Sequence, residues 1–292
     1  MGLKAGFIGL GHMGTGMSKN VLKAAGALTV FDLNKDAVQV LVDAGATAAA
    51  SGAEVMKASD VVFLSLPAPQ HVRSVVAAED GLIANAKEGD FIIDLSTIDP
   101  KTSMEMAEAA KEKGVIYVDV PVSGGMKGAN GGTLSLMAGA REEELAPIQS
   151  YIDALGKTLF VNERGFGSAF KVINNLMGFS HLVIDAECIL LAEHLGISDE
   201  QFFEVVSKGS GYDEALHRKK AKVLNRDYEA SFAIDLVVKD MELGAQMFRD
   251  MKLPLFTGNT AIQIYRMAQQ MGYGNNDNMT ILKMLREIMP AR

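Results

Sequence analysis

Cysteine is nearly absent from this sequence, since Cys188 is the only one among 292 residues. A single thiol can form neither an internal disulfide nor a cysteine-based metal site, and this usage is typical of a reducing compartment. The five histidines show no H-x-H or H-E-x-x-H spacing. We therefore expect a cytoplasmic protein without a metal site.

An excess of positive charge and long apolar runs are also missing. The net charge of -8 opposes binding to nucleic acids and to anionic membranes. The apolar run that ends at Gly9 is too short for the core of a signal peptide, and no charge-free stretch approaches 20 residues. We expect a soluble, unprocessed protein whose partners include neither nucleic acid nor membrane.

The sequence does contain the elements of a two-domain α/β protein. The hydrophobic content of 48% and the charged content of 22% are ordinary globular values. Residues 1–163 alternate short apolar runs with helix-length segments, which predicts βαβ units and a mainly parallel sheet with helices on both faces. The expected strands of this sheet are Ala5–Ile8, Ala27–Phe31, Val61–Leu64, Phe91–Asp94 and Val115–Val118.

The rest of the chain is predicted to be helical. Two further strands, Leu134–Ala138 and Thr158–Val161, flank an expected helix near Glu142–Leu155. Residues 164–292 then form the second domain, which begins with a long helix at about 168–195 that joins the two domains. Acidic residues inside this helix indicate a buried helix rather than a membrane span. Later helices are expected at Asp199–Ser207, Ala233–Asp250, Thr257–Met271 and Asn278–Ile288.

A glycine-rich loop follows the first predicted strand. Gly9, Gly11 and Gly14 have the G-x-G-x-x-G spacing and lie directly after the strand and at the start of the segment Met13–Ala25, which we expect to be helical. In this context the first glycine permits the tight turn, the second admits a pyrophosphate, and the third allows close packing of helix and strand. The loop therefore predicts a dinucleotide site, with contacts from Gly9, Leu10, Gly11, His12, Met13 and Gly14.

Polar groups after the other strands complete this predicted cofactor site. Asp32 ends the second strand, where a carboxylate accepts hydrogen bonds from ribose hydroxyls and repels a 2′-phosphate, so it favours NAD over NADP. Leu66 and Pro67 follow the strand Val61–Leu64, and Thr97 follows Phe91–Asp94. Ligands of open α/β sheets bind at these carboxyl ends of the strands.

The order and spacing of four motifs resemble those of the β-hydroxyacid dehydrogenases, which include 3-hydroxyisobutyrate dehydrogenase and tartronate semialdehyde reductase. The motifs are Gly9-Leu10-Gly11-His12-Met13-Gly14, Asp119-Val120-Pro121-Val122-Ser123-Gly124-Gly125, Gly165-Phe166-Gly167 with Lys171-Val172-Ile173-Asn174-Asn175, and Lys239-Asp240. NADP-using members often carry Asn-Arg-Thr after the second strand. This chain has Asp32-Leu33-Asn34 there, which again favours NAD.

The resemblance implies a Rossmann domain, a long connecting helix and a helical C-terminal domain that supplies oligomer contacts, as in a homodimer or homotetramer. It also implies site residues. Lys171 is the catalytic acid/base and Asn175 orients the substrate. Ser123, Gly124 and Gly125 hold the substrate carboxylate, and Asn174 also binds the substrate. Lys239 closes over substrate and cofactor, and Asp240, next to it in the same motif, binds the cofactor.

Residue chemistry agrees with this assignment. Hydride transfer at a carbinol carbon needs a positioned group that takes or gives the hydroxyl proton, and a lysine amine serves when its surroundings lower its pKa. Lys171, Asn174 and Asn175 are three and four residues apart, so they project from one side of the predicted helix. We predict an NAD-dependent oxidoreductase that interconverts a small β-hydroxycarboxylate and its semialdehyde or keto acid. The alternatives are imine reduction on the same scaffold and a non-catalytic dinucleotide-binding interaction protein.

Overall fold

A computed structural model describes residues 2–290 of the chain. The chain divides into two compact units, Met1–Lys171 and Val172–Arg292. The division falls inside the long helix α10 (Phe166–His194), whereas the sequence analysis places the boundary at residue 163. Backbone N–H groups at the start of α10 bond to Asp119, which ties this turn to the first unit. Lys171 therefore belongs to the same unit as the glycine loop.

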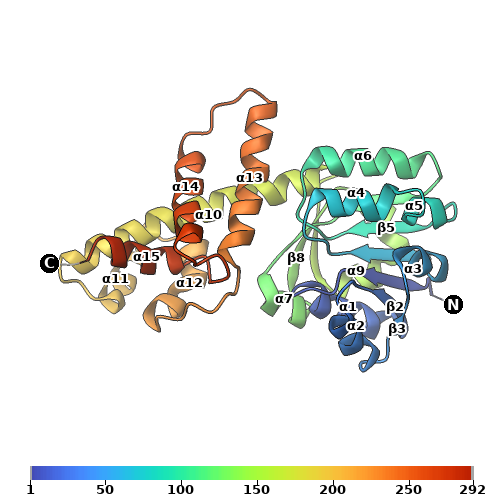
Figure 1. Cartoon of the computed structure of the whole chain (residues 1–292), viewed down its shortest axis with the longest axis horizontal. Coiled ribbons are helices and arrows are strands. Elements are labelled where there is room, and N and C mark those ends of the chain that lie inside the picture. Colours follow the sequence, from blue (N-terminus) through green and yellow to red (C-terminus); the bar gives the residue numbers. More distant parts are fainter. Residues whose placement is uncertain (1, 291–292) are drawn as a thin grey trace. The chain divides into compact units, whose positions relative to one another are not determined.

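The first unit is built on a sheet of six parallel strands in the order β3-β2-β1-β4-β5-β6 (Figure 1). This order confirms the predicted doubly wound fold. The direction of winding reverses between β1 and β4, and ligands of such folds bind at the carboxyl ends of the strands near that point. The strands are β1 (Ala5–Ile8), β2 (Leu28–Phe31), β3 (Thr47–Ala48), β4 (Val61–Leu64), β5 (Phe91–Asp94) and β6 (Ile116–Asp119).

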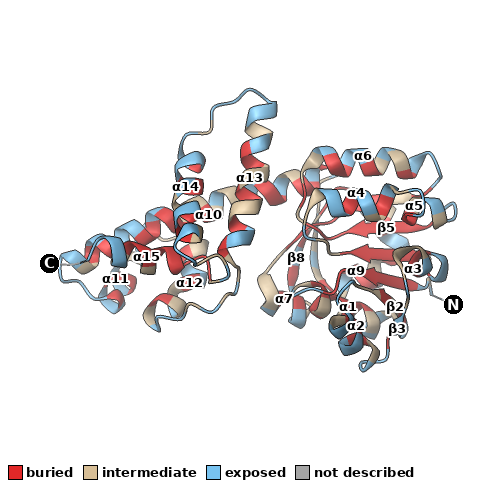
Figure 2. Ribbon diagram, in the orientation of Figure 1, coloured by how far each residue is buried: buried red, intermediate tan, exposed pale blue. Residues whose placement is uncertain are grey.

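Helices cover this sheet so completely that β1, β4 and β5 are buried along their whole length (Figure 2). Successive side chains of a strand enter opposite cores: Phe7 and Phe63 lie in one, Ile8 and Ile92 in the other. Continuous apolar runs are the sequence form that such doubly covered strands take. The helices of this layer are α1 (Gly14–Ala25), α2 (Lys35–Val42), α3 (Gly52–Ala58), α4 (Pro69–Ala77), α5 (Leu82–Asn85) and α6 (Pro100–Lys111).

A second, three-stranded sheet completes the first unit. Strand β8 (Leu134–Ala138) pairs antiparallel with β7 (Val122–Ser123) and parallel with β9 (Gly156–Phe160), and α7 (Gly125–Gly131) follows β7. The single helix expected near Glu142–Leu155 is wrong. Pro147 lies in a 3-10 turn, where its missing N–H interrupts the α-helical ladder. The turn separates two short helices, α8 (Glu142–Leu145) and α9 (Gln149–Asp153).

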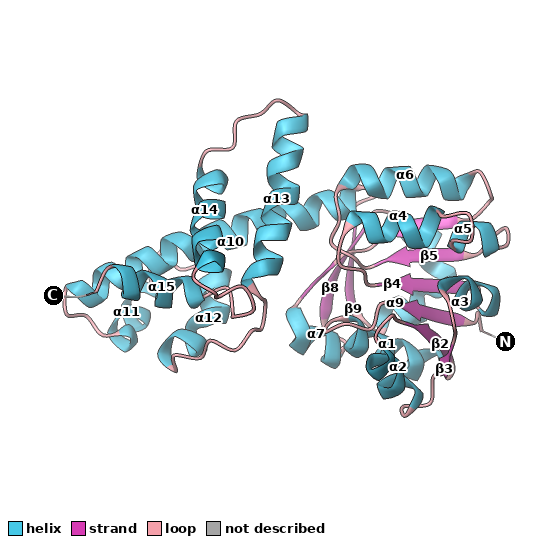
Figure 3. Cartoon of the chain, viewed as in Figure 1, coloured by secondary structure: helices cyan, strands magenta, loops and turns pink. Residues whose placement is uncertain are grey.

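Within residues 2–290 every strand precedes α10, and only helices follow it (Figure 3). One of them, α12, was not predicted. It is rich in lysine, and its buried side chains are Leu216, Lys219 and Val223, so its apolar period is weak. The Asp213 carboxylate caps it by accepting from the Leu216 N–H at 2.8 Å. The helices are α11 (Asp199–Val206), α12 (Glu214–Leu224), α13 (Ile234–Asp250), α14 (Thr257–Gln270) and α15 (Thr280–Ile288).

By length and composition alone, α10 is the one helix in the described part of the chain that could cross a membrane. In the structure 56% of its apolar 18-residue window is buried. Core helices of soluble proteins meet the same criterion of length and composition.

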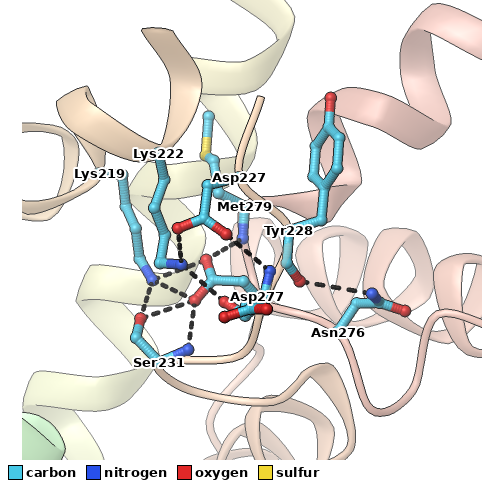
Figure 4. Close-up of polar contacts among 9 residues, drawn as sticks. Lys219, Lys222, Asp227, Tyr228, Ser231, Asn276, Asp277 and Met279 are labelled. Atoms are coloured by element: carbon cyan, nitrogen blue, oxygen red, sulfur yellow. Dashed lines mark hydrogen bonds and ion pairs between the residues drawn. The ribbon is translucent and has the colours of Figure 1, made fainter. Parts of the chain in front are cut away.

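A buried ion pair fastens the loops of the second unit around the start of α13 (Figure 4). The Lys219 ammonium lies 2.8 and 2.9 Å from the two carboxylate oxygens of Asp277, and the Ser231 hydroxyl donates to the same carboxylate at 2.6 Å. The Ile234 N–H donates to the Asn276 carbonyl. These contacts fix the first turn of α13, which leads to Lys239 and Asp240.

Candidate functional site

The glycine loop connects β1 to α1 with geometry that only glycine permits at two positions. Gly9 has a φ of +92°, and a Cβ there would collide with the Ser65 carbonyl. A Cβ at Gly14 would collide with the Gly9 carbonyl, so the start of α1 packs directly on the strand. Gly11 differs, because a Cβ there would meet no atom within 4 Å. No protein atom requires glycine at that position. A glycine there leaves space for a ligand close to the backbone, as a pyrophosphate site requires.

Asp32 faces this loop from the end of β2. Its carboxylate accepts from the Leu10 N–H at 2.6 Å and from the Asn34 N–H at 2.7 Å. One oxygen is therefore directed at the glycine loop, and the contact of this acid with a ribose stays a prediction. The Lys35 ammonium lies 5.5 Å from the centre of the Phe31 ring.

The loops after β4 and β5 are joined to each other. The Leu66 N–H donates to the Ser96 hydroxyl at 2.8 Å, and the Ser96 N–H donates to Asp94 at 2.9 Å. Thr97 is half-buried beside this bond and Pro67 is exposed. This bond joins the loop that carries Leu66 and Pro67 to the loop that carries Thr97.

Ser123, Gly124 and Gly125 form the turn from β7 into α7. Gly124 has a φ of +138° and Gly125 a φ of +62°, two successive conformations that residues with a Cβ rarely adopt. Changes of backbone direction of this kind can turn consecutive N–H groups toward a shared anion. The turn lies within the first unit, as Lys171 does.

On α10 the predicted catalytic residues differ in exposure. Lys171 and Asn175 are each 6% exposed, while Asn174 is exposed. The Asn174 amide donates to the Asn175 side-chain carbonyl at 3.3 Å. Burial of a lysine amine removes it from bulk water, which is the setting in which such a group acts as an acid or base near neutral pH.

Asp240 connects two other predicted site residues within the second unit. Its carboxylate accepts from the Asn175 amide at 2.7 Å and lies 2.8 Å from the Lys239 ammonium. Asp240 is 1% exposed. The close packing of α13 on α10 allows this contact, since a Cβ at Gly244 would lie 3.3 Å from Leu176. The Asp240 carboxylate is bonded to Asn175 and Lys239, and the contact of Asp240 with the cofactor stays a prediction.

The sequence assigned no role to two acids at the ends of neighbouring strands, although one of them, Asp119, begins the second of the four motifs. Asp94 ends β5 and Asp119 ends β6, and both are 1% exposed. Burial raises the pKa of Asp119 to about 6, against the opposing effect of hydrogen bonds from the Gly165 and Ser168 N–H groups. An acid at the end of an apolar run, as in Phe91-Ile92-Ile93-Asp94, was the available signal.

Among residues 2–290 no group of three or more histidine, cysteine, aspartate or glutamate side chains could hold a metal ion. The predicted site residues with these contacts fall into two clusters, one in each unit. The first holds the glycine loop, Asp32 and the loops after β4 and β5, and the second holds Asn175, Lys239 and Asp240.

Two family models match consecutive parts of the chain. The NAD binding domain of 6-phosphogluconate dehydrogenase matches residues 4–163. The model described as NAD-binding of NADP-dependent 3-hydroxyisobutyrate dehydrogenase matches residues 165–285. A 2-(hydroxymethyl)glutarate dehydrogenase of Eubacterium barkeri is 37% identical over 283 residues, which cover 96% of this chain and 94% of that protein. The chain belongs to the β-hydroxyacid dehydrogenase family.

Other members of the β-hydroxyacid dehydrogenase family match over nearly the whole chain. An NAD-dependent L-serine dehydrogenase of Pseudomonas aeruginosa is 35% identical, with 95% of this chain and 96% of that protein covered. A solved structure of Mycobacterium tuberculosis 3-hydroxyisobutyrate dehydrogenase with L-serine superposes with a TM-score of 0.90 at 28% identity, covering 98% of this chain and 100% of that one. These matches confirm the resemblance seen in the four motifs. The family uses NAD or NADP as its cofactor.

Proposed function

We propose that this protein is an NAD-dependent oxidoreductase that interconverts a small β-hydroxycarboxylate and its semialdehyde or keto acid. The observation that carries the proposal is the buried Lys171, which shares one compact unit with the glycine loop and Asp32. A proton-transfer group and a dinucleotide site in one compact unit are the two parts that alcohol oxidation by hydride transfer requires.

Each group has a role in the reaction. The glycine loop and Asp32 would hold NAD⁺, which would supply the acceptor for the hydride that leaves the carbinol carbon with both electrons of the C–H bond. The Lys171 amine takes the hydroxyl proton as the C=O bond forms, and gives it back in the reverse direction. Asn175, held by Asp240, orients the substrate. Lys239, paired with the same carboxylate, contributes positive charge. Ser123, Gly124 and Gly125 hold the substrate carboxylate, and Asn174 also binds the substrate.

The substrate class follows from the chemistry that the named relatives share. 2-(Hydroxymethyl)glutarate, L-serine and 3-hydroxyisobutyrate each carry a hydroxymethyl group on the carbon that bears a carboxylate. A turn of backbone N–H groups together with a serine hydroxyl suits that carboxylate. We propose that the substrate of this chain has the same pair of groups, one carbon apart.

Turnover with a panel of substrates tests this function. NADH fluorescence is followed with semialdehydes of three to five carbons, and NAD⁺ reduction with the matching β-hydroxy acids. We expect turnover of at least one carboxylate-bearing pair, and none of the analogues that lack the carboxylate. Tight NADH binding without turnover of any compound would instead support the non-catalytic alternative. That alternative and imine reduction are not favoured, because the relatives above 30% identity are hydroxyacid dehydrogenases.

We propose NAD rather than NADP because Asp32 is fixed at the predicted ribose position. We expect Asp32→Asn to lower the preference for NAD over NADP at least tenfold, measured as the ratio of the two dissociation constants by fluorescence titration. The asparagine keeps an acceptor for the Leu10 N–H but removes the charge that repels a 2′-phosphate. Asp36→Asn, which removes the same charge from an exposed site on α2, is the control. Equal changes for both cofactors in Asp32→Asn would show that this acid does not face the ribose.

We further propose that the chain forms a homo-oligomer through α10. Along this helix an apolar stripe, defined here as Phe166, Phe170, Ile173, Met177, Ile184 and Leu191, is about half exposed. At 100° per residue these side chains fall within an arc of about 60°, on the side of the helix opposite Lys171 and Asn175. A continuous exposed apolar strip of this length is typical of a protein–protein interface, and self-association would bury it.

Two charges in the apolar stripe test the oligomer. We expect light scattering to give the wild-type chain at least twice its 31.2 kDa mass, and the double variant Ile184→Glu/Leu191→Glu a mass near 31.2 kDa. Val40→Glu places the same charge on an exposed apolar position of α2 and should leave the mass unchanged. A monomeric wild type at micromolar concentration, or an unchanged mass in the double variant, would refute this interface.

A further inference from the structure

A chain of buried hydroxyl and carboxyl groups runs through the first unit, starting at the loops after β4 and β5. The Leu66 N–H donates to Ser96 at 2.8 Å, and the Ser96 N–H donates to Asp94 at 2.9 Å. The Tyr117 hydroxyl donates to the second oxygen of Asp94 at 2.7 Å. Both loops are thereby attached to one carboxylate, and β6 is attached to it as well.

The same chain continues to the first turn of α10. The Ser103 hydroxyl on α6 lies close enough to the Tyr117 hydroxyl to act on the pKa of that phenol, which it lowers, and its Oγ lies 2.8 Å from the Oγ of Ser168. The Ser168 N–H donates to Asp119 at 2.7 Å, and the Gly165 N–H donates to the other oxygen at 2.9 Å. The chain therefore ends on the turn of α10 that precedes Lys171.

Every residue of this network is at least 96% buried. Burying so many polar groups is costly unless each is bonded, and apolar side chains of similar size would stabilise the fold at least as well. The surrounding backbone also makes room for it, because a Cβ at Gly139 or Gly167 would collide with Asp119 or its neighbours. A buried polar network in this place fixes the positions of the segments that it joins.

We propose that the chain Ser96–Asp94–Tyr117–Ser103–Ser168–Asp119 is a positioning network that holds Lys171 at a set place relative to the loops after β4 and β5. This inference rests on the proposed function, which gives those loops to the cofactor and the proton transfer to Lys171. Ser168 lies three residues before Lys171, so the two project from neighbouring positions of one helix side. A displacement of about 1 Å at a reacting group can cost a factor of about 100 in rate, so small shifts here are measurable.

Single-atom deletions test the network. We expect Tyr117→Phe and Ser168→Ala to slow single-turnover hydride transfer about 5- to 20-fold, with NADH affinity within twofold of wild type and a larger primary deuterium isotope effect. The double variant should be about as slow as the slower single variant, because both break one network. Tyr151→Phe and Ser59→Ala delete buried hydroxyls of the same unit outside the network and should change none of these quantities.

Acetylation of the Lys171 amine by acetic anhydride, quantified by peptide mass spectrometry, gives a readout that needs no substrate. We expect at least threefold faster labelling of Lys171 in Tyr117→Phe and Ser168→Ala than in wild type, with Lys157 labelling unchanged. Labelling of Lys171 at the wild-type rate in both variants overturns the network, whatever the turnover. A wild type that turns over no substrate contradicts the proposed function instead, and the labelling still decides whether the network positions Lys171.

Discussion

Replacing Lys171 with alanine should lower kcat about 100- to 10,000-fold while the dissociation constant of NADH changes less than threefold. A positioned acid/base contributes rate enhancements of this size, and its removal leaves the proton of the carbinol hydroxyl without an acceptor. Cofactor affinity should survive because the glycine loop and Asp32 carry it. Stopped-flow NADH fluorescence at saturating substrate measures both quantities.

Lys157→Ala is the matched control for this change, because it removes an exposed lysine from β9 in the same unit. Its kcat should equal that of wild type. A Lys171→Ala enzyme that retains more than a third of the wild-type kcat would assign the proton transfer to another group. Proportional losses of kcat and of NADH affinity would mean that Lys171 supports the fold of the site rather than the chemistry.

Replacing Lys219 with methionine should lower the free energy of unfolding by about 3–5 kcal/mol. The substitution leaves the Asp277 carboxylate, which is 0% exposed, without its counter-charge, and breaking a buried pair typically costs that much. Lys222→Met removes a neighbouring lysine whose partner Asp227 is 44% exposed, and should cost less than about 1 kcal/mol (Figure 4). Urea denaturation followed by circular dichroism measures the difference. Similar losses of unfolding free energy in both variants would show that the buried pair stabilises the protein no more than the exposed pair does.

The pH dependence of stability provides a second check on the same pair. Burial acts to raise the pKa of Asp277, but the Lys219 ammonium and the hydrogen bonds of Lys219 and Ser231 outweigh it, so the pKa lies below its ordinary value of 3.8. A carboxyl group with a lowered folded-state pKa stabilises the protein above its unfolded-state pKa and loses that contribution as the pH falls. Below about pH 4 the wild type should therefore lose stability in a way that Lys219→Met does not.

The apolar pattern of the sequence predicted the strands whose residues are buried on both faces of the sheet. Strands buried on both faces must be continuous apolar runs, so β1, β4 and β5 were located to the residue. The two-residue strands β3 and β7 are too short to carry a pattern, and the lysine-rich α12 buries too few apolar side chains to show one. The turn at Pro147 was visible in the sequence, and the expected helix across it should have ended there.

The site was predictable as a set of residues but not as a set of contacts. The spacing of Gly9, Gly11 and Gly14 predicts the loop, because Gly9 and Gly14 each have a steric reason and Gly11 leaves room for a ligand. The bond between Asn175 and Asp240 joins residues 65 positions apart, and the bond from Ser168 to Asp119 spans 49. Such pairings depend on how helices and strands pack, which no local period encodes. Sequence motifs therefore named Asp119 and Asp240 without revealing what their carboxylates hold.

Isotope transfer tests the central claim most directly. The protein is mixed with NADH carrying deuterium on either face of nicotinamide C4 and with the semialdehyde that it turns over, and the product is examined by mass spectrometry. Direct hydride transfer with Lys171 as acid predicts one deuterium on the new carbinol carbon from one of the two NADH forms, and at least about a 100-fold slower appearance in Lys171→Ala. A product without deuterium from either form, or its formation at an undiminished rate in Lys171→Ala, would contradict this mechanism.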